Sequence, residues 1–599
     1  MDTKRLLLTI AAVLAVTIAD AIPARPGLFP YTQPDGSVIM LRRHGDEYFN
    51  WTTDASGHVV ALGKDGFYRP SSISPMQLEA ARNARRNALA LEKAARSGGD
   101  NQINFGERHI PVILMSFADN DFVIDSPREQ FDKLLNRQGY SDYGATGSVR
   151  DYYADNSEGQ FTPVFDIYGP VKLDKNVEDY KFDRYNGGDM GNAAIAISEA
   201  AVLLDSQIDF SKYDADGDGS VDMILAYYPG HNPAEGGPTI NIWPHQWYVI
   251  GKRRTVLDGK LLNRYFCSSE LKGSAGSVMC GIGTTCHEFA HTLGLPDFYD
   301  TDYEENGTSI NIDAYSLMSG GSYLNDSRTP PYLSVEERII IGWVNPGAQK
   351  ILPAGTVETP AVYNNIAWKS LTNTENEYFV YEFRDGTGWD TYLPVGLVVY
   401  HLDKSTRIVG GYHRACDLWT YWTSTNMINV FGDHPCYVLV PAPDPQNLMY
   451  GLKYYEGYGY YFPSELRTSL PFPGQEQVTT FSPVDWEGLG TGVYISKISL
   501  ADGKAVMKVS TEAEGTLAEN GYNSISHGKS YLHYDGEEFP LRILESEQDN
   551  KPVSVEWYFD GLPVSGQSVI LHVGVHTVKA LLVLADGREE VLEMEIRCE

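Results

Sequence analysis

The chain has 599 residues, which is long enough for three or four domains of about 150 residues each. Hydrophobic residues make up 42%, aromatic residues 12% and charged residues 21%, a balance that excludes a disordered, fibrous or coiled-coil chain. The formal net charge of −32 repels phosphate backbones and anionic lipid headgroups, so nucleic acid is a poor candidate partner.

The first 21 residues have the pattern of an export signal. A short basic region precedes an apolar run over residues 6–18, and residues 19–21 (Ala-Asp-Ala) form a small-x-small cleavage site. We predict cleavage after Ala21, so that Ile22 begins the exported chain. The apolar run is shorter than the roughly 20 residues of a spanning helix, so we predict no transmembrane anchor. A secreted protein is expected, with the periplasm or the cell surface as alternatives.

Residues 22–105 form the next segment. Between residues 27 and 68, short apolar runs alternate with Asp-Gly and Ser-Gly turns, which predicts small β-hairpins. Residues 76–95 are rich in Ala, Leu, Arg and Glu and predict a helix, and a Ser-Gly-Gly linker follows at residues 97–99. The change in composition near residue 100 marks the first boundary.

Residues 106–345 alternate between strand and helix patterns, which predicts an α/β or α+β domain. The predicted strands are residues 109–117, 162–171 and 221–228, and the predicted helices are residues 147–155, 191–204 and 284–293.

Beyond residue 345 the pattern is almost entirely that of strands separated by Gly and Pro turns. Residues 346–512 are predicted to form a β-rich domain with strands at 378–383, 396–402, 437–440 and 493–498. Residues 513–599 are predicted to form an immunoglobulin-like β-sandwich with strands at 553–559, 576–584 and 591–596.

The six cysteines would lie in a compartment where disulfides persist. Six cysteines allow 15 pairings, which the sequence does not resolve. Closeness along the chain favours the pairs Cys267 with Cys280 and Cys416 with Cys436.

A His-Glu-x-x-His motif is the strongest functional signal in the chain. On a helix, His287 and His291 lie on one face, so both imidazoles can bind a single Zn²⁺. Glu288 then points to the side of the metal, where it can take a proton from a zinc-bound water. A Gly-Leu-Pro turn at residues 294–296 ends the helix and returns Asp297 as an oxygen ligand. Three protein ligands and one water position describe a catalytic zinc site.

Two alternatives to this interpretation are disfavoured. A competing zinc-peptidase architecture takes a Glu from a second helix as third ligand, but residues 297–325 are rich in Gly, Asn and Asp and do not have a helical pattern. A chance motif on a buried helix is the other alternative. Thr284 and Thr285, which are N-cap candidates before the motif, argue against it. Met318, in a Gly and Ser rich loop, resembles the methionine turn under the zinc of metzincins.

The segments around the motif are similar to a known family. Residues 287–300 (HEFAHTLGLPDFYD) and 313–323 (DAYSLMSGGSY) resemble the immune inhibitor A family of secreted zinc metalloendopeptidases. Supporting matches extend the resemblance over most of the chain, at residues 147–161, 212–222, 242–247, 341–346, 377–384 and 396–403.

The resemblance implies a proenzyme with a metzincin-like catalytic domain, calcium sites and C-terminal β domains. It assigns His287, His291 and Asp297 as zinc ligands, Glu288 as the catalytic base and Met318 as the turn methionine. The predicted fold is therefore multidomain, with an α/β (α+β) metzincin-like zinc peptidase domain between a propeptide and all-β domains.

Residues 214–222 have the spacing of a calcium-binding loop. Positions 1, 3, 5, 7 and 9 of an EF-hand-like loop are taken by Asp214, Asp216, Asp218, Ser220 through its carbonyl, and Asp222. Four carboxylates within nine residues repel one another unless a cation is bound. Because Leu225 replaces the usual bidentate Glu and an apolar strand follows, we predict a structural Ca²⁺ site, with an empty solvated turn as the alternative.

The propeptide implied by the resemblance, residues 22–105, contains no cysteine, so a thiolate cannot block the zinc. A carboxylate or simple steric cover are the remaining alternatives. Basic residues near the linker are candidate processing sites, although a solvated helix face explains them equally well. They are Arg85, Arg86, Lys93 and Arg96.

We therefore predict a secreted zinc-dependent metalloendopeptidase that hydrolyses extracellular or host proteins, with one catalytic Zn²⁺ and at least one structural Ca²⁺. Glu288 takes the water proton and passes it to the leaving amine. Tyr323, His245 and Tyr299 are candidates for a second oxyanion donor. The alternative is a secreted adhesin or glycan-binding protein whose zinc domain is a scaffold. The presence of Glu288 argues against it, because a scaffold does not need a catalytic base. The sequence does not predict an oligomeric state.

Overall fold

The structure is a computed structural model, and the residues it describes fall into several stretches. They are residues 22–46, 49–74, 76–77, 101–180, 191–249, 253–301, 312–411, 414–424, 426–445, 447, 453–455, 459–461, 464–510, 524–525, 533, 535–544 and 552–598. The predicted export signal, the four candidate processing residues and nearly all of the helix predicted at 76–95 lie outside these stretches. Among the described residues, no helix has the length and apolar character needed to cross a membrane.

The chain divides into two compact units. The first contains residues 1–154 and 158–294, and the second contains residues 155–157 and 295–599. The finer domain boundaries, at residues 105, 345 and 512, stay predictions.

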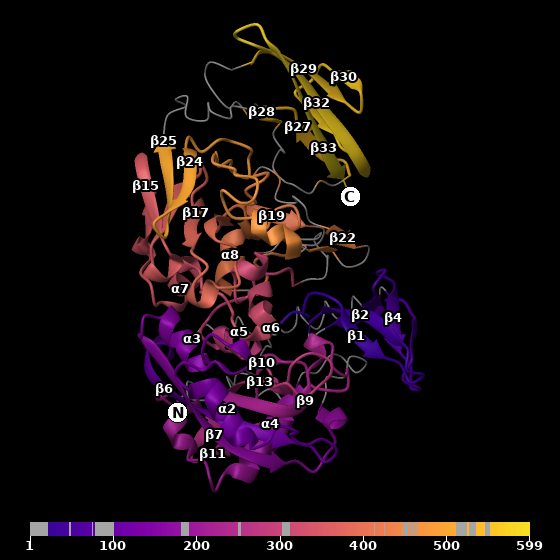
Figure 1. The fold of residues 1–599 in the computed structure, drawn as a ribbon, viewed down its shortest axis with the longest axis vertical. Coiled ribbons are helices and arrows are strands. Elements are labelled where there is room, and N and C mark those ends of the chain that lie inside the picture. The colour runs from indigo at the N-terminus through magenta and orange to yellow at the C-terminus, as the bar shows by residue number, and fades with distance from the viewer. Residues whose placement is uncertain are drawn as a thin grey trace, which may run out of the picture. The chain divides into compact units, whose positions relative to one another are not determined.

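The first unit begins with an antiparallel five-stranded meander, drawn in indigo in Figure 1. Its strands follow chain order: β1 (Phe29–Thr32), β2 (Val38–Gly45), β3 (Asn50–Asp54), β4 (Val59–Leu62) and β5 (Tyr68–Pro70). Gly36, Gly57 and Gly66 in the connecting turns have φ angles of 85°, 89° and 81°, which only glycine adopts without strain. The hairpins predicted from the Asp-Gly and Ser-Gly turns are confirmed.

The main sheet of the first unit has the strand order β10-β13-β9-β6-β7. Its strands are β6 (Gly106–Ser116), β7 (Phe161–Lys172), β9 (Ile224–His231), β10 (His245–Tyr248) and β13 (Arg264–Leu271). All neighbours pair in parallel except β10, which lies antiparallel to β13 at one edge. A small second sheet joins β8 (Ser220–Val221), β12 (Lys260–Leu262) and β11 (Val256–Leu257).

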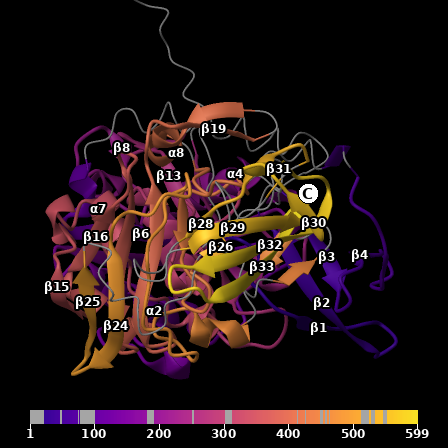
Figure 2. The same cartoon turned by 90° about the horizontal axis from the view of Figure 1, so that it is seen from above.

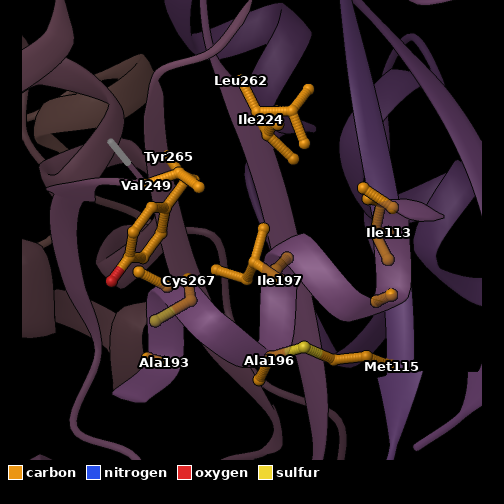
Figure 3. Packing of buried hydrophobic residues seen from close by; sticks show 14 of the residues in the cluster. Ile113, Met115, Ala193, Ala196, Ile197, Ile224, Val249, Leu262, Tyr265 and Cys267 are labelled. Carbon is orange, nitrogen blue, oxygen red and sulfur yellow. The ribbon is translucent and has the colours of Figure 1, made fainter. Parts of the chain in front are cut away.

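Four α-helices accompany the sheet in the part of the chain that the structure describes. They are α2 (Pro127–Asn136), α3 (Val149–Asn156), α4 (Gly191–Leu204) and α5 (Gly283–Thr292). Figure 3 shows α4 side chains, among them Ala196 and Ile197, packed towards Ile113 and Met115 of β6. Small alanines let the helix approach the sheet closely, and the apolar area removed from water stabilises the contact.

The second unit is built mainly from strands. A five-stranded sheet has the order β14 (Gln349–Ile351), β16 (Ala367–Leu371), β17 (Glu377–Arg384), β18 (Gly396–Asp403) and β21 (Tyr437–Leu439). Strands β15 (Gly355–Pro360), β25 (Lys504–Ser510) and β24 (Tyr494–Ala501) form a separate sheet, seen side by side in Figure 2. Two hairpins add β19 (Ile408–Gly411) with β20 (Arg414–Asp417) and β22 (Lys453–Tyr455) with β23 (Gly459–Tyr461). The described helices here are α6 (Leu324–Ser327), α7 (Val335–Ile341) and α8 (Leu418–Ser424).

The C-terminal strands form a four-stranded sheet, drawn in yellow in Figure 1. Its order is β30 (Leu562–Val564), β29 (Pro552–Phe559), β32 (Gly574–Leu584) and β33 (Glu589–Cys598). Two short pairs lie outside it: β27 (Glu538–Pro540) with β31 (Ser568–Ile570), and β26 (Ser524–Ile525) with β28 (Ile543–Leu544). Phe539 and Leu571 share one core with Val578 and Leu582. The immunoglobulin-like topology itself stays a prediction.

The predicted disulfides are wrong. Cys267 and Cys436 are buried free thiols, and each belongs to one of the two favoured pairs, so neither pair forms. The Cys267 side chain packs in the core between β13 and α4 (Figure 3). Burial raises the pKa of the Cys267 thiol well above its usual value, which keeps it protonated and unreactive.

Candidate active site

Helix α5 carries the His-Glu-x-x-His motif, and all ten of its residues are buried. It ends as predicted: Gly294 has a φ of 104° and donates its N–H to the His291 carbonyl at 3.0 Å. The predicted N-caps are wrong, because the helix already begins at Gly283 and places both threonines inside its first turn. The hydroxyl groups of Thr285 and Tyr227 instead form a hydrogen bond with each other, with their oxygens 2.6 Å apart.

The three predicted zinc ligands come together at the end of α5. His287, His291 and Asp297 are all buried, and their ligand atoms lie within 4.8 Å of one another. The two Nε2 atoms of the histidines are 3.2 Å apart. Two nitrogens bonded to one tetrahedral zinc at about 2.0–2.1 Å are separated by roughly 3.3 Å. The donor set, two imidazoles and one carboxylate, therefore fits a catalytic zinc ion.

Glu288, the predicted base, lies buried beside these ligands and contacts the N-terminal segment. Its Oε1 accepts a hydrogen bond from the backbone N–H of Ile22 at 2.8 Å. Trp243 holds the same residue from the other side, since its Nε1 donates to the Ile22 carbonyl at 3.0 Å. No sequence motif signalled this contact, which joins residues 266 positions apart.

Further contacts fix the N-terminal segment within the first unit. The N–H of Arg25 donates to the Ala234 carbonyl at 2.8 Å. The ring of Phe29 covers Gly236 so closely that a Cβ there would lie 2.8 Å from ring carbon Cδ1. Gly236 also has a φ of 91°, so both the turn and the close approach of the ring require glycine.

Met318 is fully buried in the predicted methionine turn. Its carbonyl accepts the N–H of Phe298, the residue after Asp297, at 2.9 Å, and its own N–H donates to Ser316 Oγ at 2.9 Å. Ser316 Oγ in turn donates to Glu337 Oε1 at 2.5 Å. A chain of hydrogen bonds therefore connects the turn to the segment that carries the carboxylate ligand.

Asn426 is a site residue that the sequence did not reveal. Its side-chain amide accepts the N–H of Asp297 at 2.5 Å and donates to Asp297 Oδ2 at 2.6 Å. The two residues are 129 positions apart, and no motif surrounds Asn426.

The predicted calcium loop brings three of its carboxylates together. Asp214, Asp216 and Asp218 each offer an oxygen within 4.8 Å of the others. Asp222 is not in this group, and its Oδ2 accepts the N–H of Ala215 at 3.0 Å. Burial, with repulsion from the other loop carboxylates, raises the pKa of Asp222 to about 6.

Asp214 is the anchor of this loop. Its Oδ2 accepts Lys260 Nζ at 2.5 Å, and its buried Oδ1 has no hydrogen-bond partner. Ser220 follows in β8, which pairs with β12 beside Lys260. A buried carboxylate oxygen without a hydrogen-bond partner, on a residue clustered with two other carboxylates, suits an oxygen-binding cation such as Ca²⁺.

His245, one of the three oxyanion candidates, is already engaged at both ring nitrogens. Nδ1 contacts the Trp243 carbonyl at 2.6 Å and Nε2 contacts the Tyr265 hydroxyl at 2.8 Å. The remaining candidates, Tyr323 and Tyr299, are buried. His245 is therefore part of the sheet edge rather than a free donor.

Comparisons with known proteins agree with this geometry. Residues 108–337 match the family model described as "Immune inhibitor A peptidase M6, catalytic domain". Immune inhibitor A of Bacillus thuringiensis subsp. alesti is 25% identical over 249 residues, which cover 35% of this chain and 36% of that protein. Pre-pro-metalloprotease PrtV of Vibrio cholerae serotype O1 (strain M66-2) is 26% identical over 224 residues, or 33% of this chain and 24% of PrtV.

The matched region thus spans about a third or less of these relatives' lengths. Among solved structures, OgpA of Akkermansia muciniphila aligns with 82% of this chain and 93% of its own at 11% identity. The TM-score of this alignment is 0.24.

The burial of His245 makes the free energy of unfolding depend on pH. Burial lowers the pKa of His245 to about 4, whereas an unfolded histidine titrates near 6.5. As pH falls from 6.5 to 4, His245 becomes protonated in the unfolded state but stays neutral in the folded state. His245 should therefore reduce the free energy of unfolding by up to about 3 kcal/mol over this window.

The measurement is denaturant unfolding of the wild type and of His245→Gln between pH 7 and pH 4.5. Gln can keep both hydrogen bonds but does not titrate, so the variant should lose less stability on acidification. Parallel pH curves for the two proteins would contradict the prediction.

Proposed function

We propose that this protein is a secreted zinc-dependent metalloendopeptidase acting on extracellular or host proteins, because residues 108–337 match the catalytic domain of the immune inhibitor A peptidase M6 family. The observation that carries the proposal is the buried cluster of His287, His291 and Asp297, with Glu288 on the same helix. In this proposal the catalytic domain extends over residues 106–345, after a propeptide at residues 22–105. The domains at 346–512 and 513–599 follow it.

The proposed mechanism assigns a role to each residue of the cluster. A Zn²⁺ held by the two histidines and the aspartate would supply Lewis-acid polarisation of the scissile carbonyl and of water. Glu288 takes the proton of the attacking water at a carboxylate oxygen and delivers it to the leaving amine. Met318 supports the ligand segment through its bond to Phe298.

Replacement of the base tests this proposal. Glu288→Gln keeps the shape of the side chain but cannot accept a proton, so cleavage of casein and gelatin by the processed protein should fall by about 10²-fold to 10⁴-fold. Zinc content, measured on the same samples, should not change.

Glu129→Gln is the matched control, because Glu129 lies on the exposed face of α2 in a pair with Lys133. It should retain wild-type activity and zinc. If the wild type holds zinc but cleaves neither substrate, the general protease proposal is wrong.

We further propose that the N-terminal segment keeps the enzyme latent. The N–H of Ile22 donates to Oε1 of Glu288, the proposed base, which supports a block by backbone contact rather than by a carboxylate. With the predicted cleavage after Ala21, this nitrogen would become an α-ammonium and the bond would be charge-assisted.

Loosening the segment should raise the activity of the unprocessed chain. Phe29→Ala removes the ring that covers Gly236, and a loss of about 1.4 kcal/mol of apolar contact would raise the open population about tenfold. Leu28→Ala, at a neighbouring exposed side chain, should have no such effect. Hydrolysis of a fluorogenic peptide is measured, with N-terminal sequencing to verify that each chain is uncut. A fully active wild-type chain that begins at Ile22 would refute latency by this segment.

We propose that the loop at residues 214–222 binds a structural Ca²⁺. The clustered oxygens of Asp214, Asp216 and Asp218 and the buried Oδ1 of Asp214 support this assignment. The ion would fix the short sheet formed by β8 and β12.

Calcium should therefore stabilise the protein against heat. At a concentration 100 times the dissociation constant, the gain in unfolding free energy is about 2.7 kcal/mol, and Asp214→Asn should abolish it. Asp205→Asn removes an exposed carboxylate outside the loop and serves as the control. Thermal unfolding with Ca²⁺ and with Mg²⁺ measures the effect, and an equal response of both variants would contradict the site.

A further inference from the structure

The third candidate ligand, Asp297, is held at its backbone and at its side chain by a single amide. Asn426 Oδ1 accepts the Asp297 N–H at 2.5 Å, and Asn426 Nδ2 donates to Asp297 Oδ2 at 2.6 Å. Asn426 is 1% exposed and Asp297 is fully buried, so water does not compete for either bond.

From this arrangement we infer that Asn426 is a positioning residue that fixes the third metal ligand. A turn of the Asp297 side chain breaks the bond at Oδ2, and a shift of its backbone breaks the bond at the N–H. One oxygen suffices for a metal bond, so the bond at Oδ2 is compatible with ligation through Oδ1. This inference deepens the proposed function and rests on it.

The physical effect is that of a hydrogen-bond donor behind a metal-binding carboxylate. Such outer partners orient the ligand before the ion arrives, and their loss typically weakens metal binding about 10- to 100-fold. A neutral amide also supports the ionised form of the carboxylate without adding a charge that competes with the cation.

Asn426 is itself fixed by its surroundings in the second unit. The backbone carbonyl of Asn426 accepts a hydrogen bond from the Thr301 hydroxyl at 2.9 Å. Three residues on, Asn429 exchanges hydrogen bonds with the backbone of Tyr437, the first residue of β21, at 2.7 Å and 2.9 Å. The position of the ligand is thereby tied to the five-stranded sheet, through a segment outside the matched catalytic domain.

The chain offers a matched control in Asn429. It is equally buried, and its Nδ2 also donates to the ligand segment, at the Phe298 carbonyl, 3.0 Å away. Its side-chain hydrogen bonds go to Phe298 and Tyr437 and not to Asp297. Loss of either amide therefore damages the same segment, but only loss of Asn426 removes a bond to the ligand itself.

The experiment compares the full-length wild type with Asn426→Leu, Asn426→Ala and Asn429→Ala. Asn426→Leu has nearly the same shape, so it fills the same space while it removes the hydrogen bonds to Asp297 and adds no charge. Each protein is stripped of metal, and its zinc dissociation constant is measured by competition with a chelating indicator. Unfolding midpoints of the metal-free proteins report structural damage, and the visible spectra of the Co²⁺ forms report ligand geometry.

Both Asn426 variants should bind zinc about 10- to 100-fold more weakly than the wild type and change the Co²⁺ spectrum. Asn429→Ala should stay within about threefold of the wild type and keep its spectrum, even where its metal-free form is less stable. Asn426 variants that bind like the wild type, or a loss of affinity that follows stability in all three variants, would overturn the inference. A wild type that takes up no zinc would instead overturn the proposed metal site.

Discussion

The candidate site depends on the abrupt end of helix α5. His287 and His291 need a helix to share a face, whereas Asp297 can reach the same point only if the chain leaves the helix within one turn. Gly294 provides this exit in the left-handed conformation, and Pro296 prevents the helix from continuing. A single local constraint therefore converts a run of eleven residues into a cluster of two imidazoles and a carboxylate.

Beyond this local geometry, the site is supported by polar groups in buried surroundings. Ser316 and Glu337 stabilise the turn that carries Met318, and burial raises the pKa of Glu337 against the opposing effect of its hydrogen bonds. Asn426 supports Asp297 in the same manner. Burying a polar group without a hydrogen-bond partner costs free energy, so each of these groups fixes the position of its neighbour in the folded chain.

The sequence predicts contacts between residues that are close along the chain, and it does not predict contacts between residues that are far apart along the chain. The pattern at residues 287–297 predicted the cluster because helix periodicity and a Gly-Leu-Pro turn are local. The contacts of Ile22 with Glu288 and of Asn426 with Asp297 join distant positions, and tertiary packing alone creates them. The same limit explains the wrong disulfides, which were inferred from closeness along the chain. The threonine N-caps failed for a different reason, since a buried helix can begin at Gly283 without a side-chain cap.

The ammonium of Lys260 at Asp214 gives the acidic loop an internal counter-ion. A monovalent cation supplied by the chain itself offsets part of the carboxylate repulsion before any metal is present. Strands β8 and β12 can therefore pair in a calcium-poor compartment. In the proposed calcium site, a divalent ion would therefore bind a loop whose negative charge is already partly neutralised by the chain itself.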